Sequence, residues 1–126
     1  MSKHETWRTI EYWEKEDGLL IEEFVITTKS SDRGLRVIDG LIIMGEKKER
    51  RKSIIFNIKG RDIICIQTKK GRLGMSVMGQ AFFSRELLKK NKPNSIRTVI
   101  ICGKDDLLLR EICLKYELEV VIIPDK

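Results

Sequence analysis

Apolar residues recur along this chain with two different spacings, which predict where helices and strands lie. A spacing of three to four residues, typical of helices, runs through residues 3–17, 75–90 and 104–116. Short β-rich apolar runs predict strands over residues 19–28, 35–44, 53–58, 62–69, 96–102 and 118–123. The early strands follow one another, and the late ones alternate with helices. This order predicts an α/β protein with a central mixed sheet that helices cover on both faces.

Three of these segments carry more detailed expectations. The apolar run in residues 62–69 is continuous, which is typical of a strand buried on both faces. Residues 96–123 form a strand-helix-strand unit, so its two strands should be parallel. The helix over residues 75–90 should turn one apolar side to the core, formed by Met75, Met78, Phe82 and Leu87.

The composition is that of one soluble globular domain spanning residues 1–126. Hydrophobic residues make up 41% of the chain and charged residues 35%, which excludes disordered, collagen-like and membrane classes. No apolar run approaches the ~18 residues that a bilayer-spanning helix needs. The polar N-terminus does not have the pattern of a secretory signal. We therefore expect a cytoplasmic protein with no membrane partner.

The cysteines and the histidine exclude several kinds of site. Cys65, Cys102 and Cys113 lie among apolar residues without a CxxC pair, which indicates reduced core residues. His4, the single histidine of the sequence, lies near the N-terminus. Triads that depend on histidine and Cys/His zinc sites are therefore excluded, and any chemistry must come from Asp, Glu, Lys, Gln or Ser.

Positive charge is concentrated in one stretch of the chain. The formal net charge is +6, yet residues 46–72 alone carry 10 basic and 3 acidic side chains. Such a local excess attracts polyanions, nucleic acid above all. The stretch is also compatible with a solvated, lysine-rich surface hairpin. Its densest part, a predicted basic hairpin, carries Lys47, Lys48, Arg50, Arg51 and Lys52.

One acid, one amide and one ammonium are predicted to meet at an edge of the sheet. Asp39 follows apolar residues in the strand over residues 35–44, and Lys69 closes the strand over residues 62–69. Gln67 lies two residues before Lys69 and therefore on the same face of that strand. A charge in a buried strand is costly unless it is paired or binds a metal. A structural Asp39–Lys69 ion pair, or a turn at Asp39, would explain the same residues without catalysis.

The order of elements and these residues together resemble the PD-(D/E)xK nuclease superfamily, the restriction-endonuclease-like phosphodiesterases. Members have a core of helix, three-stranded meander, helix and strand, with an Asp on the second strand and (D/E/Q)-x-K on the third. The matching residues here are Asp39, preceded by Ile38 where many members have Pro, and the Gln67-Thr68-Lys69 run. The resemblance covers roughly residues 3–102 and implies a restriction-endonuclease-like core with an inserted basic hairpin.

The resemblance implies hydrolysis of phosphodiester bonds in DNA by a metal-dependent endonuclease. Asp39 and Gln67 would hold Mg²⁺, for which Mn²⁺ would substitute, and Lys69 would orient the attacking water and stabilise the charge on the phosphate. Gln67 departs from the acidic residue that most members carry, which affects metal affinity. A small chain with one site would need a C2 homodimer to cut both strands, and no small-molecule cofactor is expected.

Two further positions follow from the same resemblance. Members often carry another Glu on the first helix, and we place this role on Glu5. The other acids that remain open for it are Glu11, Glu14, Glu22 and Glu23. Gln80 resembles a glutamine that some RecB-like members carry on the helix after the Lys motif, and is expected to contact nucleic acid. It is equally compatible with the polar side of an amphipathic helix.

Three other functions are open to this sequence. A catalytically silent nucleic-acid-binding module of the same fold is the main alternative, because Gln67 brings no charge to the site. An interaction protein that presents residues 96–123 to a partner is the second. A nucleotide-binding Rossmann unit is disfavoured, because the turn at residues 102–106 has no glycine-rich phosphate loop and carries two acids.

Overall fold

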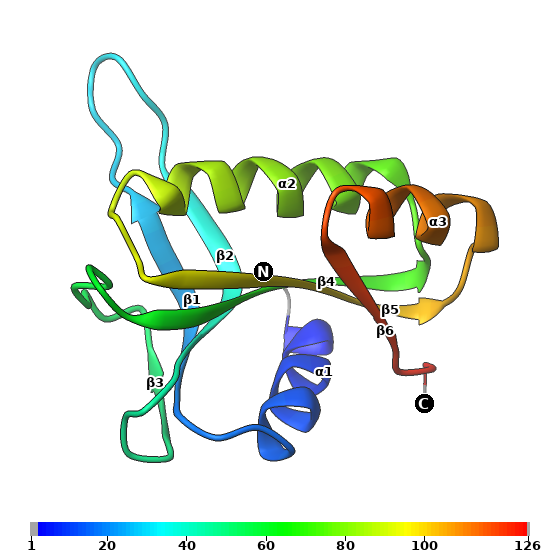
Figure 1. Cartoon of the computed structure of the whole chain (residues 1–126), viewed down its shortest axis with the longest axis horizontal. Coiled ribbons are helices and arrows are strands. Elements are labelled where there is room, and N and C mark those ends of the chain that lie inside the picture. The colour runs from blue at the N-terminus through cyan, green and yellow to red at the C-terminus, as the bar shows by residue number, and fades with distance from the viewer. Residues whose placement is uncertain (1–2, 126) are drawn as a thin grey trace.

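A mixed β-sheet with helices on both faces forms the described part of the chain (Figure 1). The computed structural model describes the backbone of residues 3–125 and the side chains of residues 7–125. Within that range the fold is α/β, with six strands and three helices. The helices are α1 (Lys3–Glu14), α2 (Met75–Lys89) and α3 (Leu107–Lys115). The strands are β1 (Leu19–Thr27), β2 (Arg36–Ile43), β3 (Glu49–Lys52), β4 (Asp62–Arg72), β5 (Ser95–Lys104) and β6 (Leu118–Ile122).

The sheet has the strand order β3-β1-β2-β4-β5-β6. β2 is antiparallel to both β1 and β4, while β5 is parallel to β4 and to β6. The parallel β5–β6 pair confirms the prediction for residues 96–123. α1 covers one face of the sheet, and α2 and α3 cover the other (Figure 1).

The prediction of a basic hairpin is wrong, because residues 49–52 form the edge strand β3. β3 pairs with β1 in parallel, with Leu19 opposite Glu49 and Glu22 opposite Lys52, so β3 belongs to no hairpin. The strand predicted over residues 53–58 is also absent, since these residues have no regular structure. Ser53 adopts a φ of 53°, which turns the chain out of the strand directly after Lys52.

The sheet separates the core into two layers. On the α1 side, Trp13 packs with Leu20, Ile42, Ile64 and other strand residues. The layer under α2 is built by alternate residues of the same strands and is closed by Leu88 of α2. β4 is buried from Ile63 to Thr68, as the continuous apolar run predicts.

α1 lies so close to the sheet that β2 must carry a glycine where they meet. A Cβ on Gly40 would come within 2.7 Å of the Cγ2 atom of Thr9 in α1 and 3.3 Å of the Leu20 Cδ1 atom. Glycine is therefore required by close approach at this position. It directly follows Asp39, so the same contact fixes the backbone that presents the acid.

The buried side of α2 differs from its predicted side. Val77, Ala81 and Leu88 are buried, whereas Met75, predicted to face the core, is 74% exposed. Met78 and Phe82 are partly buried and pack against the core. Met75 is exposed because it is the first residue of α2, at the mouth of a cleft rather than over the sheet.

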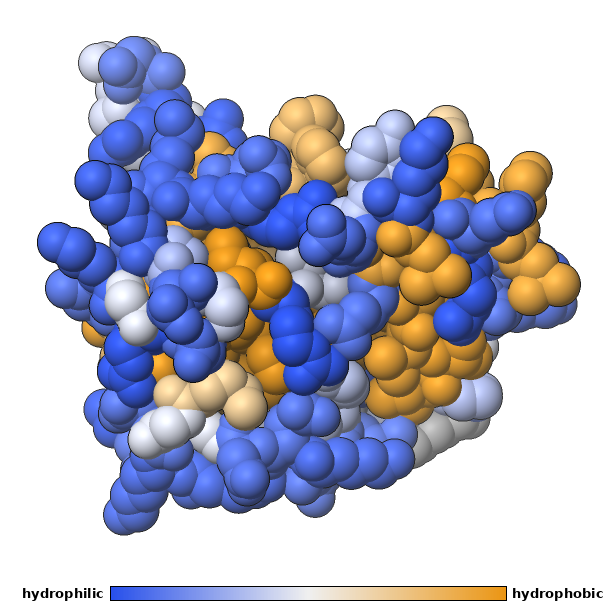
Figure 2. All heavy atoms as spheres, in the orientation of Figure 1, coloured by the Kyte–Doolittle hydropathy of each residue, from blue (hydrophilic) through white to orange (hydrophobic). Residues whose placement is uncertain are grey.

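Hydrophobic side chains are unevenly distributed over the face of the molecule drawn in Figure 2. Figure 2 shows hydrophobic side chains gathered over α3 and β6, while hydrophilic side chains dominate around β1 and β3. Three leucines account for much of the apolar surface of α3: Leu107 is 79% exposed, Leu108 69% and Leu114 64%. None of the helices in residues 3–125 combines the length and apolar character needed to cross a bilayer.

Candidate active site

Two neighbouring antiparallel strands bring Asp39 and Gln67 together. The β2–β4 ladder pairs Gly40 with Ile66, and the next positions along it are Asp39 and Gln67. Residues opposite one another on antiparallel strands have Cβ atoms about 5 Å apart. Both residues line one cleft of about 780 Å³. The predicted meeting of this acid and this amide at one point of the sheet is therefore present.

The carboxylate of Asp39 is held by the residue that follows Gln67. The backbone N–H of Thr68 donates to Asp39 Oδ2 at 2.8 Å, and the Thr68 hydroxyl donates to the same oxygen at 2.9 Å. Thr68 is 6% exposed, so these bonds are shielded from water. They fix the orientation of the carboxylate before any ligand arrives. Sequence reasoning did not assign this role to Thr68, although it occupies the middle of the Gln67-Thr68-Lys69 run.

Helix α2 orients the amide of Gln67. The Gln67 Nε2 atom donates to the Ser84 hydroxyl at 3.2 Å, and the side chain is 6% exposed. Because the amide nitrogen is directed to α2, the carbonyl oxygen lies on the other side of the amide group. Ser84 was also missed, yet it sits one helical turn after Gln80, which lines the same cleft.

Lys69 lies beyond this pair, towards the end of β4. It is exposed and is paired in register with Cys102 of β5. By strand alternation its side chain shares a face with that of Gln67. Lys69 is not among the described residues that line the cleft. The structure thus brings Asp39 and Gln67 together in the cleft, whereas Lys69 is exposed two residues further along β4 and does not line the cleft.

Of the acids considered for a further role, Glu23 lies nearest in register to Asp39. β1 pairs Glu22 with Gly40 and Phe24 with Ile38, which leaves Glu23 opposite Asp39. Glu23 has a φ of 51°, rare for a residue with a side chain, and its carboxylate lies 3.1 Å from the Lys52 ammonium. The row Glu23, Asp39 and Gln67 crosses three adjacent strands.

The remaining acids lie elsewhere or outside the described side chains. Glu22 is 7% exposed and pairs with Arg50, whose Nε atom is 3.3 Å from its Oε2 atom. Glu11 lines a separate cavity near the C-terminal residues Val121–Pro124. Glu14 is exposed at the end of α1. Glu5 lies outside the residues whose side chains the structure describes, so its predicted role stays a prediction.

Most of the basic segment, defined here as residues 47–52, contacts its own chain. Arg50 pairs with Glu22, Lys52 with Glu23, and Arg51 with Glu49 at 3.2 Å. These ion pairs neutralise part of the positive charge that the sequence concentrates here. The segment lies two strands away from β2, which is about 10 Å at the usual strand spacing.

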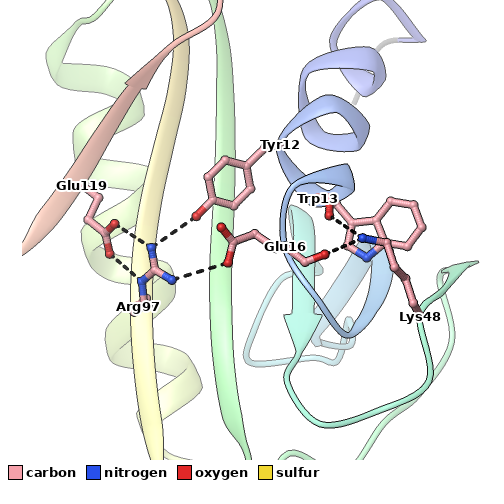
Figure 3. A network of polar contacts seen from close by, with 6 residues as sticks. All are labelled: Tyr12, Trp13, Glu16, Lys48, Arg97 and Glu119. Carbon is pink, nitrogen blue, oxygen red and sulfur yellow. Dashed lines mark hydrogen bonds and ion pairs between the residues drawn. The ribbon is translucent and has the colours of Figure 1, made fainter.

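Lys48 has a structural role at the end of α1 (Figure 3). Its ammonium donates to the carbonyl oxygens of Glu14 at 3.0 Å and Glu16 at 2.5 Å, and lies 5.0 Å from the centre of a Trp13 ring. A cation at the C-terminal end of a helix meets unpaired carbonyls and the negative end of the helix dipole. Lys47 is exposed.

The cysteines are buried, and their thiols have raised pKa values. Burial raises the pKa of Cys65 to about 12, and the negative charge of Asp39 acts in the same direction. Burial also raises the pKa of Cys102 and that of Cys113. All three therefore stay protonated near neutral pH, as expected for core residues.

The donor set at the cleft fits a hard divalent cation such as Mg²⁺. Asp39 supplies a carboxylate, Gln67 an amide oxygen and Thr68 a main-chain carbonyl, which are the oxygen donors that Mg²⁺ prefers. Among the described residues there is no group of three or more His, Cys, Asp or Glu side chains that could hold a metal. The protein set is thus sparse, which suits an ion that retains several waters.

Comparisons with protein-family models, with curated proteins and with solved structures found no match to this chain. The interpretation of the cleft consequently depends on its own geometry and chemistry.

Proposed function

We propose that this chain is a metal-dependent nuclease that hydrolyses phosphodiester bonds in DNA. The observation that carries the proposal is the register of β2 and β4, which sets Asp39 opposite Gln67 at the floor of a cleft beside α2. The element order supports it as well. With β3 left aside, α1, β1, β2, β4, α2 and β5 follow the order of a restriction-endonuclease-like core, including its antiparallel meander.

Each residue has a distinct role in the proposed reaction. Asp39 and Gln67 would hold Mg²⁺, which would supply Lewis-acid polarisation of the phosphodiester. Thr68 keeps the carboxylate of Asp39 in place through two hydrogen bonds. Lys69, exposed on β4 two residues after Gln67, brings a positive charge to the phosphate as negative charge grows there. Gln80 lines the cleft from α2 and would contact a neighbouring phosphate.

A catalytically silent DNA-binding module is the second candidate. It is favoured by one observation: the described residues place a neutral amide, Gln67, where a second carboxylate would strengthen metal binding. The homodimer also stays a prediction, and sedimentation of the purified protein measures it directly.

A cleavage assay with site variants tests the nuclease. With Mg²⁺ or Mn²⁺ the protein should cut DNA, and EDTA should stop the reaction. Asp39→Asn and Lys69→Ala should each lower the rate by about 10² or more, because each removes charge stabilisation at the reacting phosphate. DNA binding should be nearly unchanged, since neither residue supplies most of the affinity.

One control variant and two possible outcomes make the assay decisive. Lys104→Ala removes an exposed lysine near the end of the neighbouring strand β5 and should leave the rate within about twofold. If Asp39→Asn cuts as fast as the wild type, the site lies elsewhere. If the wild type binds DNA but no metal supports cleavage, the silent module is the correct function.

A further inference from the structure

The walls of the candidate cleft are apolar and face solvent. Leu35 is 58% exposed and Val37 41%, and both line the cleft from the side of the β1–β2 hairpin. Met75 is 74% exposed and Phe83 66%, and both line it from α2. Four exposed apolar side chains around one cleft indicate a binding surface rather than scattered surface residues. The polar floor of Asp39 and Gln67 lies between these walls.

Phe83 is held in place by its neighbours. Its ring meets the ring of Phe82 edge-on, with centroids 5.3 Å apart and an angle of 84° between the planes. The Phe82 ring in turn meets the Tyr116 ring with centroids 6.1 Å apart, and the Arg85 guanidinium lies 5.1 Å from the centre of the Phe82 ring. A supported ring that remains largely exposed can accept a flat apolar partner at little entropic cost.

Positive charge borders the hairpin wall of this cleft. Arg36 lines the cleft, and its guanidinium donates to Gly34 O at 3.2 Å, which ties it to the base of the hairpin. Lys29 and Arg33 lie on the hairpin loop, and within residues 7–125 their side chains make no hydrogen bond or ion pair. Figure 1 shows this loop projecting beyond the sheet on the side of α2.

The hairpin loop also has a defined shape. The Ser30 N–H donates to Arg33 O at 2.9 Å, and the Ser30 hydroxyl donates to the Asp32 carboxylate at 2.7 Å. These bonds close the turn between Lys29 and Arg33. The two cations are thus held on a firm projection beside the cleft, unlike Arg50 and Lys52, which pair with acids of β1.

We propose that the cleft takes an unpaired, single-stranded segment of DNA. Its bases lie against Phe83 and Met75, and its phosphates follow Arg36, Arg33 and Lys29. An aromatic platform beside a basic track is the arrangement by which proteins bind single strands. A duplex keeps its base faces stacked inside, so it would leave these apolar walls without a partner. The inference depends on the proposed function and narrows its substrate.

The test compares a fluorescent single-stranded oligonucleotide with its blunt duplex by anisotropy, in EDTA to prevent cleavage. We expect the single strand to bind more tightly. Phe83→Ala should weaken its binding by roughly tenfold and change duplex binding by less than twofold. Leu108→Ala is the matched control, because Leu108 is 69% exposed but lies on α3, away from the cleft.

Two further variants secure the result. Phe83→Leu keeps an apolar side chain without an aromatic face, so it should bind the single strand as weakly as Phe83→Ala if stacking is responsible. Lys29→Ala/Arg33→Ala should lower the slope of log K against log salt by about 1.4, or about 0.7 for each phosphate that is no longer neutralised. Equal affinity for both DNAs, with no effect of Phe83→Ala, would overturn the inference while leaving the nuclease intact. Failure to bind or cut any DNA would instead refute the proposed function itself.

Discussion

Gln67 determines the electrostatics of the cleft floor. It is 6% exposed and lies opposite Asp39, so a carboxylate in its place would face a like charge on the neighbouring strand in a poorly solvated position. The neutral amide avoids that repulsion in the absence of a metal. At the proposed metal site, the neutral amide would also attract a cation less strongly than a carboxylate would.

Gln67→Glu should reverse this balance. Without metal the variant should melt at a lower temperature than the wild type, because the new carboxylate faces Asp39. Added Mg²⁺ should then raise its melting temperature more than that of the wild type, and cleavage should survive. Thermal unfolding with and without Mg²⁺ measures both effects.

The control for this variant is Gln80→Glu. Gln80 also lines the cleft, but it is exposed on α2, so the same added charge is screened by solvent. An equal Mg²⁺ response in the two variants would mean that position 67 does not contribute to a metal site.

At the scale of elements, the packing of α1 on β2 holds the acid in position. Thr9 of α1 is fully buried against the glycine that follows Asp39. A shift of the helix would move the β2 backbone where the β2–β4 ladder ends. The geometry of the cleft floor is therefore coupled to a helix on the opposite face of the sheet.

Gly40→Ala tests this packing. The new Cβ would overlap the Cγ2 atom of Thr9, so we expect a loss of about 1–3 kcal/mol in the free energy of unfolding. Adding Thr9→Ser removes that methyl group and should recover part of the loss. Urea unfolding of the single and double variants gives the values.

Gly79→Ala provides the contrast within the same fold. A Cβ at Gly79 in α2 has no atom within 4 Å, so this variant should gain about 0.5–1 kcal/mol from helix propensity. If Gly40→Ala were as stable as the wild type, the close approach of α1 would have no energetic consequence.

At the scale of the whole molecule, positive charge is present in two places with different degrees of pairing. The basic segment 47–52 is largely engaged with β1 and the end of α1, while the β1–β2 hairpin carries Lys29 and Arg33, whose side chains have no partner within residues 7–125. Both places can contribute to the field that attracts a polyanion, because a field depends on net charge. Direct phosphate binding additionally requires a side chain that can leave its present partner.

Replacing the basic segment tests its share of DNA binding. The variant with Ala at Lys47, Lys48, Arg50, Arg51 and Lys52 should bind DNA more weakly. The slope of log K against log salt should also become less steep, by up to about 0.9 for each duplex phosphate that the segment neutralises in the wild type. The variant should also have a lower melting temperature, because Glu22, which is only 7% exposed, loses its ion-pair partner Arg50. Binding titrations at several salt concentrations, with melting curves alongside, separate the two effects.

The double variant Lys47→Ala/Arg51→Ala tests the DNA contacts of the basic segment with less effect on stability. Arg51 pairs only with the partly exposed Glu49 among the described residues, so its loss should leave stability unchanged within about 0.5 kcal/mol. An unchanged salt slope in both variants would show that the segment serves the fold alone.

The sequence alone was enough to predict the three helices and every strand except β3, and to select Asp39 and Gln67 as candidate site residues. The continuous apolar run of β4 required burial on both faces, and helical spacing with Gly18 marked the extent of α1 to within three residues. Asp39 stood out because a charge in an apolar strand needs a partner, and Gln67 stood out through its spacing before Lys69. These are local signals, since each depends only on residues a few positions apart.

The place of β3 in the sheet could not be predicted from the sequence and became known only from the three-dimensional structure. β3 pairs with β1 in a parallel ladder, accompanied by the ion pairs Arg50–Glu22 and Lys52–Glu23 and by the Lys48 contacts with the end of α1. All of these contacts join residues that lie far apart along the chain. The same applies to the hydrogen bonds from Thr68 to Asp39 and from Gln67 to Ser84, and to the exposed wall of Phe83. Strand pairing is a non-local choice among several edges with similar apolar patterns. The pairing depends on how the whole sheet packs under its helices, and that packing cannot be inferred from local periodicity.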